Sequence, residues 1–193
     1  MSYAKRYLQA HGQAATIQRT PTATTIVSMK RSTRATRDPG IRDSFWEGIA
    51  DNASNLAGGE IMTVGADNYL IQSANTDPAS GELAFFAVKT NAELTPKRIT
   101  ASLDADNNIV EVWGWTPSGT VVEGFGQIVT AQLRASDPGL LDSSRYLFFV
   151  PASAGLQVMD RVILTGENLM VNAIDSLMLE GVSRIQCGSD NRV

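Results

Sequence analysis

The segments "RATRDPGIRDS" (residues 34–44) and "RASDPGLLDS" (residues 134–143) share Asp-Pro-Gly, two variable residues and Asp-Ser. Tight turns favour Pro and Gly at these places, so this match alone carries little weight. Two further matches keep the same order along the chain. "IQRTPTATT" (17–25) matches "VWGWTPSGT" (112–120) before the Asp-Pro-Gly segments, and "GEIMTVGADNYLIQS" (59–73) matches "DRVILTGENLMVNA" (160–173) after them. Three collinear matches predict that one unit occurs twice, with convergent turn chemistry as the alternative.

Both halves consist of short stretches rich in Thr, Ile and Val, separated by Gly, Pro, Asn and Asp. This pattern favours small barrels or sandwiches over alternating strands and long helices. We therefore expect an all-β protein with minor α content, built from two tandem, similar small β-barrels at residues 15–92 and 97–190. Residues 1–14 are expected to form an N-terminal arm with a short helix, and residues 92–98, which contain Pro96, a linker.

One region departs from a clean repeat. In the first half, residues 38–59 favour a short helix that carries Phe45, Trp46 and Ile49 and is capped by Asp43 or Ser44. In the second half, residues 120–135 favour strand structure, and the segment after the Asp-Pro-Gly turn, "RYLFFVP" (145–151), favours a strand as well. The two copies are thus predicted to differ in the segment that follows this turn.

The size and composition of the chain set broad limits. Its 193 residues, 43% of them hydrophobic, suit one medium domain or two small ones. Its apolar runs fall short of the roughly 18 residues that a membrane helix needs, and the N-terminal residues lack the apolar core of a signal peptide. We expect a soluble chain made in the cytoplasm, with the lone Cys187 as a small hydrophobe in a terminal strand.

Positive charge is concentrated at the N-terminus. Residues 1–37 carry seven basic residues and no acid, and the remainder carries nine basic and twenty acidic residues. Such asymmetry indicates a basic arm or face that meets either nucleic acid or the acidic body of a neighbouring copy. The residues expected to make this contact are Lys30, Arg31, Arg34 and Arg37, with a solvated face as the alternative.

Motifs for catalysis or metal binding fail on inspection. His11 is the only histidine and lies in the polar arm, where no third group would hold it for nucleophilic catalysis. The run "DADNN" (104–108) starts like a calcium loop, but Ile109 replaces the turn glycine and Trp115 the bidentate glutamate. We expect a turn there. The chain is accordingly predicted to have no catalytic residue, no metal site and no cofactor, and not to be an enzyme.

Four aromatic residues are candidates for subunit interfaces: Phe45, Trp46, Trp113 and Trp115. Trp113 and Trp115 alternate along a predicted strand and share one of its faces, and Phe45 and Trp46 precede a Gly-rich stretch. Such residues can form a core wall, an interface anchor or a platform on which bases stack.

The stretch "FFVPASAGLQVMDRVILTGENLMVNAIDSLMLEGVSRIQC" (148–187) has a distinctive order. A strand ends in Val-Pro, a small-residue loop follows, Asp-Arg-Val opens a strand, and a Gly turn leads to two more strands. It resembles the β-barrel of the tailed-bacteriophage head completion proteins, also called stoppers or head-tail connector proteins. The first half, "SMKRSTR" (28–34) with "GGEIMTVGADNYLIQSANTDPASGELAFFAV" (58–88), resembles the same barrel.

The resemblance implies a non-enzymatic structural protein of the virion neck. Its partners would be the portal or adaptor ring on one side, tail or tail-terminator proteins on the other, and genomic DNA in the channel, with no membrane. Members of the family usually carry one barrel, so six copies of a two-barrel chain would offer twelve modules on a six-fold frame. This favours a homo-hexameric ring, with a dodecamer as a possibility. A module that binds single-stranded nucleic acid is the alternative function.

Overall fold

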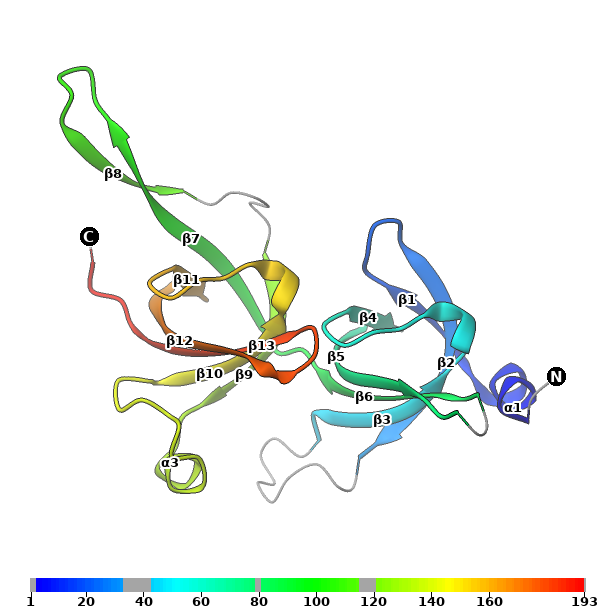
Figure 1. The fold of residues 1–193 in the computed structure, drawn as a ribbon. Helices are drawn as coiled ribbons and strands as arrows, with labels where there is room; N and C mark the ends of the chain where they lie inside the picture. Colours follow the sequence, from blue (N-terminus) through cyan, green and yellow to red (C-terminus); the bar gives the residue numbers. More distant parts are fainter. Residues whose placement is uncertain (1–2, 33–42, 79–80, 115–120, 193) are drawn as a thin grey trace.

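The computed structural model describes residues 3–32, 43–78, 81–114 and 121–192 of the chain. They form two antiparallel β-barrels that lie side by side, with two short α-helices (Figure 1). The helices are α1 (Tyr3–His11) and α3 (Ala131–Ser136). The mostly β architecture with two similar barrels and a short N-terminal helix confirms the fold class predicted from the sequence.

The first barrel contains six strands: β1 (Gln13–Ile17), β2 (Ala23–Arg31), β3 (Phe45–Ala50), β4 (Ile61–Val64), β5 (Asp67–Thr76) and β6 (Leu83–Lys89). They are hydrogen-bonded in the order β1-β2-β3-β6-β5-β4, and pairing of β4 with β1 closes the barrel. A 3-10 turn, η1 (Asn52–Ser54), connects β3 to the β4–β5 hairpin. Closure leaves no unpaired edge in this barrel.

The second barrel repeats this order with one added strand. Its strands are β7 (Ala92–Leu103), β8 (Ile109–Gly114), β9 (Val122–Ile128), β10 (Tyr146–Pro151), β11 (Arg161–Leu164), β12 (Glu167–Leu179) and β13 (Val182–Ser189), and its 3-10 turn is η2 (Ala152–Ala154). The barrel order is β7-β9-β10-β13-β12-β11, closed by pairing of β11 with β7. Strand β8 pairs with the far half of β7, outside the barrel.

Equivalent residues of the two barrels also share their register. Asn68 pairs with Thr63 across the β4–β5 hairpin, and Asn168 pairs with Ile163 across the β11–β12 hairpin. The carbonyl of Asn68 accepts the Thr90 amide (2.9 Å), and that of Asn168 accepts the Asp190 amide (3.0 Å). Both long strands carry an irregularity, after Ile71 and after Val171. Asn68 and Asn168 therefore occupy equivalent places, as the sequence match predicts.

The structure corrects two secondary-structure predictions around the Asp-Pro-Gly segments. Residues Phe45–Ala50, predicted as helical, form β3, because β2 and β6 pair with it on both sides and override its local helix signals. Residues Ala131–Ser136, predicted as a strand, form α3, which Thr130 caps by accepting the Leu133 amide at 3.2 Å. The first correction makes the barrels more alike, since β3 and β10 are equivalent strands.

The predicted linker at residues 92–98 is also wrong. It is the first half of β7, whose neighbours change along its length. Ala92–Leu94 pair with β9, Leu94–Lys97 with β11, and Arg98–Leu103 with β8. Pro96 lies where β7 is paired on one side only, which is a tolerable place for a residue that lacks an amide hydrogen. The short connection between the barrels is residues 90–91, between β6 and β7.

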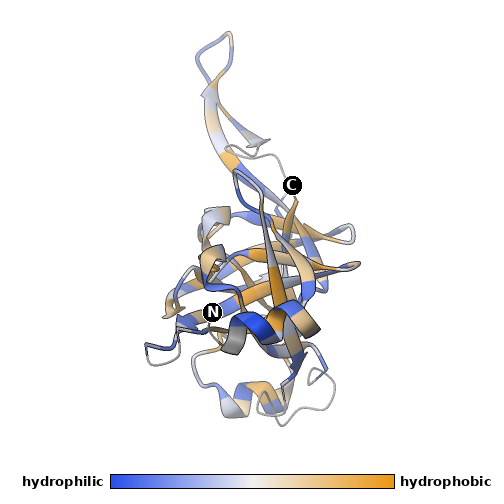
Figure 2. Cartoon of the chain, turned by 90° about the vertical axis from the view of Figure 1, so that its right-hand side faces the viewer, coloured by the Kyte–Doolittle hydropathy of each residue, from blue (hydrophilic) through white to orange (hydrophobic). Residues whose placement is uncertain are grey.

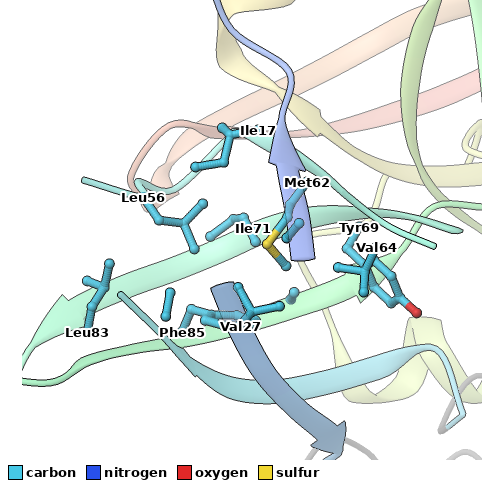
Figure 3. Packing of buried hydrophobic residues seen from close by; sticks show 12 residues of the cluster. Ile17, Val27, Leu56, Met62, Val64, Tyr69, Ile71, Leu83 and Phe85 are labelled. Atoms are coloured by element: carbon cyan, nitrogen blue, oxygen red, sulfur yellow. The ribbon is translucent and has the colours of Figure 1, made fainter. Parts of the chain in front are cut away.

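Each barrel encloses its own apolar core. In the first, Ile17, Val27, Met62, Ile71 and Phe85 point inward from five different strands (Figure 3). The core of the second is formed by residues that include Leu94, Phe148, Val162, Val171 and Ile185. Because barrel residues alternate between inside and outside, the outward rows are free to make other contacts.

The β7–β8 hairpin is the feature that the first barrel lacks. It projects from the body of the molecule, and both views place its tip at the top (Figures 1 and 2). Residues 112–114, which open the segment matched to residues 17–25, belong to β8, whereas the described connection between β1 and β2, residues 18–22, contains no strand. The remainder of that segment, residues 115–120, lies outside the described residues.

Candidate assembly surfaces

The two barrels contact each other through an apolar cluster that is separate from either core. Ile61, Leu70 and Val88, on the outside of the first barrel, pack against Phe125 and Val182 of the second. Phe125 is only 1% exposed. Phe125 cannot be recognised from the sequence alone, because nothing local distinguishes an outward phenylalanine that is buried by another barrel from one in a core.

Phe45 lies at the centre of an aromatic row at this contact. Its ring is 5.6 Å from that of Phe125 and 5.9 Å from that of Phe86, and Phe125 is in turn 6.5 Å from Phe149. These separations lie in the range of favourable aromatic pairs. Phe45, predicted as a subunit-interface residue, thus contacts the other barrel of its own chain.

Polar and close backbone contacts flank the aromatic row. The Asn68 side-chain amide donates to the Glu123 carboxylate (2.7 Å), and Gly59 of the first barrel lies against Gly181 of the second. A Cβ atom on Gly59, whose φ is +81°, would lie 1.8 Å from the Gly181 carbonyl oxygen, so this approach requires glycine. The barrels therefore contact each other through their backbones as well as through apolar side chains.

The contact joins different faces of two similar barrels. The second-barrel equivalents of Ile61 and Leu70 are Arg161 and Met170, and neither belongs to the shared cluster. The first-barrel equivalents of Phe125 and Phe149 are Ser28 and Ile49, which are also outside it. Such a head-to-tail arrangement is heterologous, the type of contact from which rings and filaments are built.

A salt bridge repeats in the two barrels at equivalent places. Arg19 Nη1 lies 3.0 Å from Glu60 Oε1, and Arg98 binds both oxygens of Asp160 at 2.7 Å. Each arginine also donates to a carbonyl in the turn after η1 or η2, at Asn55 or Gly155. The acids complete the turn by accepting the amides of Ala57 or Gln157.

This repeated pair anchors the loop that leads from each 3-10 turn into the next hairpin. The hydrogen bonds that Arg98 donates to Asp160 raise the pKa of Arg98, so the guanidinium keeps its charge at neutral pH. This repeated salt bridge is not evident from the sequence, because its partners are far apart in the chain. Comparison of the repeats could have found it, since a basic and an acidic residue recur at both pairs of positions.

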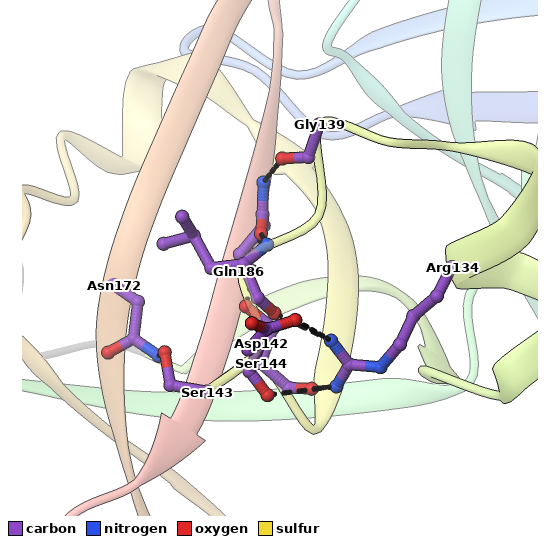
Figure 4. Close-up of polar contacts among 8 residues, drawn as sticks. Arg134, Gly139, Asp142, Ser143, Ser144, Asn172 and Gln186 are labelled. Carbon is purple, nitrogen blue, oxygen red and sulfur yellow. Dashed lines mark hydrogen bonds and ion pairs between the residues drawn. The ribbon is translucent and has the colours of Figure 1, made fainter.

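The second Asp-Pro-Gly segment is fixed against the outside of its barrel (Figure 4). Arg134 donates to the carbonyl oxygens of Leu141 (2.8 Å) and Ser144 (2.6 Å). Gln186, on β13, donates to the Gly139 carbonyl (3.0 Å), and its side-chain oxygen accepts from Leu141 and Ser144. Hydrogen bonds from β13 thus hold this loop.

Trp113 lies at the root of the β7–β8 hairpin, over two arginines. Its ring centroid is 4.0 Å from the Arg161 guanidinium carbon and 5.0 Å from that of Arg192. Asp190 accepts from Arg161 Nε (2.7 Å) and Arg192 Nε (2.8 Å). Burial disfavours the Asp190 carboxylate, but hydrogen bonds from Arg192 and Arg161 outweigh this and lower its pKa. Trp113 therefore packs within the chain, on the C-terminal residues.

The predicted basic contact residues are only partly described. Lys30 and Arg31 lie at the end of β2 with exposed side chains, 3.4 Å from Glu47 and 3.3 Å from Asp43 respectively. Exposed pairs of this kind contribute little free energy and leave both groups accessible to a partner. Arg34 and Arg37 lie outside the described residues, so the four-residue run remains a prediction.

The other predicted aromatic residues differ in their surroundings. Trp46 packs against the core of the first barrel, and its ring is 5.7 Å from that of Tyr69 in an edge-on arrangement. Its equivalent in the second barrel is Tyr146. Trp115 lies outside the described residues.

A hollow of about 750 Å³ opens on the outside of the first barrel. Tyr7 of α1 forms one wall, and the floor is formed by outward residues of β2, β3, β5 and β6, among them Ser28, Ile49, Ala84 and Phe86. Lys30 and Glu47 lie on its lining. Since Phe86 stacks on Phe45, this surface continues the aromatic row of the contact between the barrels.

Three further findings bear on the chemistry of the chain. Among residues 3–32, 43–78, 81–114 and 121–192, no group of three or more His, Cys, Asp or Glu could hold a metal ion. No helix within these ranges is long and apolar enough to cross a membrane. Cys187 is fully buried, and burial raises the pKa of its thiol to about 12, so it is un-ionised at neutral pH.

Comparison with known proteins gave no assignment. No protein-family model matches the chain, and no curated protein matches it.

Proposed function

We propose that the chain is a structural subunit of a tailed-phage neck, a head-tail connector or stopper that forms a ring around the DNA channel. The observation that carries this proposal is the heterologous packing of two similar barrels within one chain. A repeated unit joined head to tail already makes one step of a repeating assembly, and repetition of that step by further copies closes a ring. We attribute the two barrels to tandem duplication of one unit.

In this role the ring lies in the virion neck, after synthesis in the host cytoplasm. Its faces meet the portal or adaptor on one side and tail or tail-terminator proteins on the other. The basic N-terminal stretch, residues 1–37, faces the channel DNA or an acidic neighbour, through Lys30, Arg31, Arg34 and Arg37. No step in this role requires a catalytic residue or a cofactor.

The placement of basic and aromatic residues favours this role over single-strand nucleic-acid binding. Lys5 and Arg6 lie on α1, Arg19 follows β1, and Lys30 and Arg31 end β2, so these bases do not line one strand face. Tyr7 is 41% exposed, and the other aromatic residues for which the structure describes the side-chain exposure are buried or half-buried. A groove for single strands combines a basic track with exposed aromatic platforms, and these positions do not supply one.

Electron microscopy of the particle from which the chain comes tests the proposal. We expect six copies in a closed ring at the neck. A ring of twelve would keep the connector role but remove the six-fold explanation for two barrels. A monomeric protein absent from the neck would overturn the proposal, and tight DNA binding by the free chain, with a logarithmic salt slope of about 0.9 per phosphate, would favour the alternative.

A further inference from the structure

The β7–β8 hairpin carries exposed apolar residues on a projecting, two-stranded element. Leu103 and Ile109 pair directly across the hairpin, and their exposed fractions are 65% and 75%. Val110, 38% exposed, adds a third apolar side chain. A two-stranded hairpin is at best marginally stable alone in water, and exposed strand edges invite pairing with another surface. The hairpin is therefore suited to contact a partner.

The tip of the hairpin is well defined. Asp104 Oδ1 accepts the amides of Asp106 (2.9 Å) and Asn108 (2.8 Å), and Asn107 takes a positive φ of 64°. The paired stretch beyond the barrel starts at Arg98 and ends at Leu103, so it spans about 20 Å at about 3.3 Å per residue. The hairpin presents its apolar pair at the end of a structured arm.

The partner must be outside the molecule that carries the arm. In Figure 1 the tip of the hairpin and α1 lie at opposite ends of the molecule. The hollow on the first barrel, beside α1, is the apolar surface that continues the aromatic row between the barrels. An arm at one end and a hollow at the other are the two halves of a head-to-tail contact.

Charge also matches the arm to the surroundings of the hollow. Residues 99–114 contain three acids, Asp104, Asp106 and Glu111, and no base. Lys5, Arg6, Lys30 and Arg31 lie on α1 and β2 beside the hollow, and Glu47, an acid on its lining, is paired with Lys30 at 3.4 Å. Opposite potentials on two surfaces steer them together and set their orientation.

The barrel equivalence points the same way. The first barrel holds the second through outward residues of β4 and β5, Ile61 and Leu70. The equivalent strands of the second barrel are β11 and β12, and the arm grows out of β7, which pairs with β11. The arm thus emerges beside the counterpart of the face that holds a barrel within the chain.

We propose that the β7–β8 arm of one copy docks into the hollow on the first barrel of the next copy, with Leu103 and Ile109 over Ile49, Ala84 and Phe86. This inference rests on the proposed ring and names its interlocking surfaces. The contact adds no reaction step, and repeating it joins copies in the order first barrel, second barrel, first barrel of the next chain.

Disulfide trapping tests the contact in the full chain. Leu103→Cys and Ala84→Cys both change exposed side chains, and the native Cys187 is buried and will not compete. Mild oxidation of an equal mixture of the two variants, at concentrations up to about 1 mM, should give a disulfide-linked dimer between positions 103 and 84. Leu177→Cys, at a 98% exposed site on the other long hairpin, replaces Leu103→Cys in the matched control. We expect at least tenfold less dimer in the control.

Equal yields of dimer in the two mixtures would overturn the proposal, and so would the absence of any linkage at the highest concentration. If the thiol at position 84 resists small alkylating reagents, the hollow is filled from within the chain, and the proposal is overturned as well. A second measurement uses Leu103→Asp with Ile109→Asp, which should abolish any self-association seen by ultracentrifugation. A neck ring seen by microscopy without the 103–84 linkage would retain the proposed function and reject the arm contact. If the 103–84 linkage forms but the particle has no neck ring of this chain, the arm contact is retained and the proposed function is rejected.

Discussion

The two barrels share strand order and register but differ in which outer surfaces are covered. In the second, one end of the outer face of β9, β10 and β13 packs on the first barrel through Phe125 and Phe149. The loop that follows α3 covers the other end, where it is held by hydrogen bonds with Arg184 and Gln186. At Phe125, Phe149, Arg184 and Gln186, the outer face of the second barrel is therefore contacted by other parts of the chain.

In the first barrel, the equivalent positions are Ser28, Ile49, Ala84 and Phe86, and all four line the hollow. Inward positions keep their apolar character in both barrels, with Ile71 matched by Val171 and Phe85 by Ile185. The inward rows therefore define the barrel, and the outward rows define what each barrel contacts. The following experiments break or sharpen this difference, starting with the largest expected effect.

Replacement of Phe125 with Ala should cause the largest loss of stability. The side chain is buried where the barrels meet, so its truncation leaves a cavity and should lower the free energy of unfolding by about 3–5 kcal/mol. Ser28→Ala, at the equivalent first-barrel position, should change it by less than about 0.5 kcal/mol. Urea unfolding followed by tryptophan fluorescence measures both. Similar losses in the two variants would contradict the difference in burial between these equivalent positions.

The repeated salt bridge should also be stronger in the second barrel. The Asp160 side chain is only 3% exposed and binds Arg98 through both oxygens, whereas Glu60 is 17% exposed and binds Arg19 through one. We expect Asp160→Ala to lower the free energy of unfolding by about 3 kcal/mol, because it removes the buried carboxylate that accepts hydrogen bonds from Arg98 and from the Gln157 amide.

Glu60→Ala is the matched variant, and its loss should be about 1–2 kcal/mol. Urea unfolding at pH 7 compares the two. A larger loss for Glu60→Ala would contradict the ranking by burial and geometry.

Much of the barrel architecture could be predicted from local signals. Gly65 and Gly166 mark the turns of the β4–β5 and β11–β12 hairpins, and both hairpins form as expected. Strand β3 could not be predicted this way, because Phe45, Trp46 and Ile49 fit a helix locally and only pairing with two other strands makes them extended. The prediction of a linker at Pro96 failed for a related reason, since the exchange of neighbours along β7 is a property of the closed barrel.

The candidate surfaces were less accessible from the sequence. The aromatic signal drew attention to Phe45, which contacts the other barrel of its own chain, but its partner Phe125 and the hollow depend on residues that are distant in the chain. Trp113 illustrates the opposite case, in which a residue chosen as an interface candidate stacks on Arg161 and Arg192 of its own chain. Burial between elements is a tertiary property, so composition and alternation cannot assign it.

The second barrel should differ from the first in its response to acid. Asp190 accepts hydrogen bonds from two arginines, and its equivalent in the first barrel is Thr90, which cannot ionise. Because the folded-state pKa of Asp190 is lowered, its contribution is fully present above the unfolded value of about 4 and is lost as the pH falls toward the folded value.

Asp190→Asn should therefore cost about 2 kcal/mol at pH 7, and the difference from the unaltered chain should narrow below about pH 4. Urea unfolding between pH 7 and 2 measures this difference. Asp142→Asn, at a fully exposed carboxylate, is the control and should show no such narrowing. If the difference in free energy of unfolding between the variant and the unaltered chain stays constant down to pH 2, protonation of Asp190 is not coupled to unfolding.

The smallest expected effect on stability comes from removal of the arm, which makes the second barrel resemble the first. Replacing residues 101–111 with Asn-Gly joins Thr100 to Val112, which already pair, through a two-residue turn that suits a hairpin. The removed part contributes exposed Leu103 and Ile109 and lies outside the barrel order, so the free energy of unfolding should change by less than about 0.5 kcal/mol. Trp113 and its contacts with Arg161 and Arg192 remain. Urea unfolding of the shortened chain measures the change, and a loss above about 2 kcal/mol would show that the arm supports its own barrel instead of projecting as a separate element.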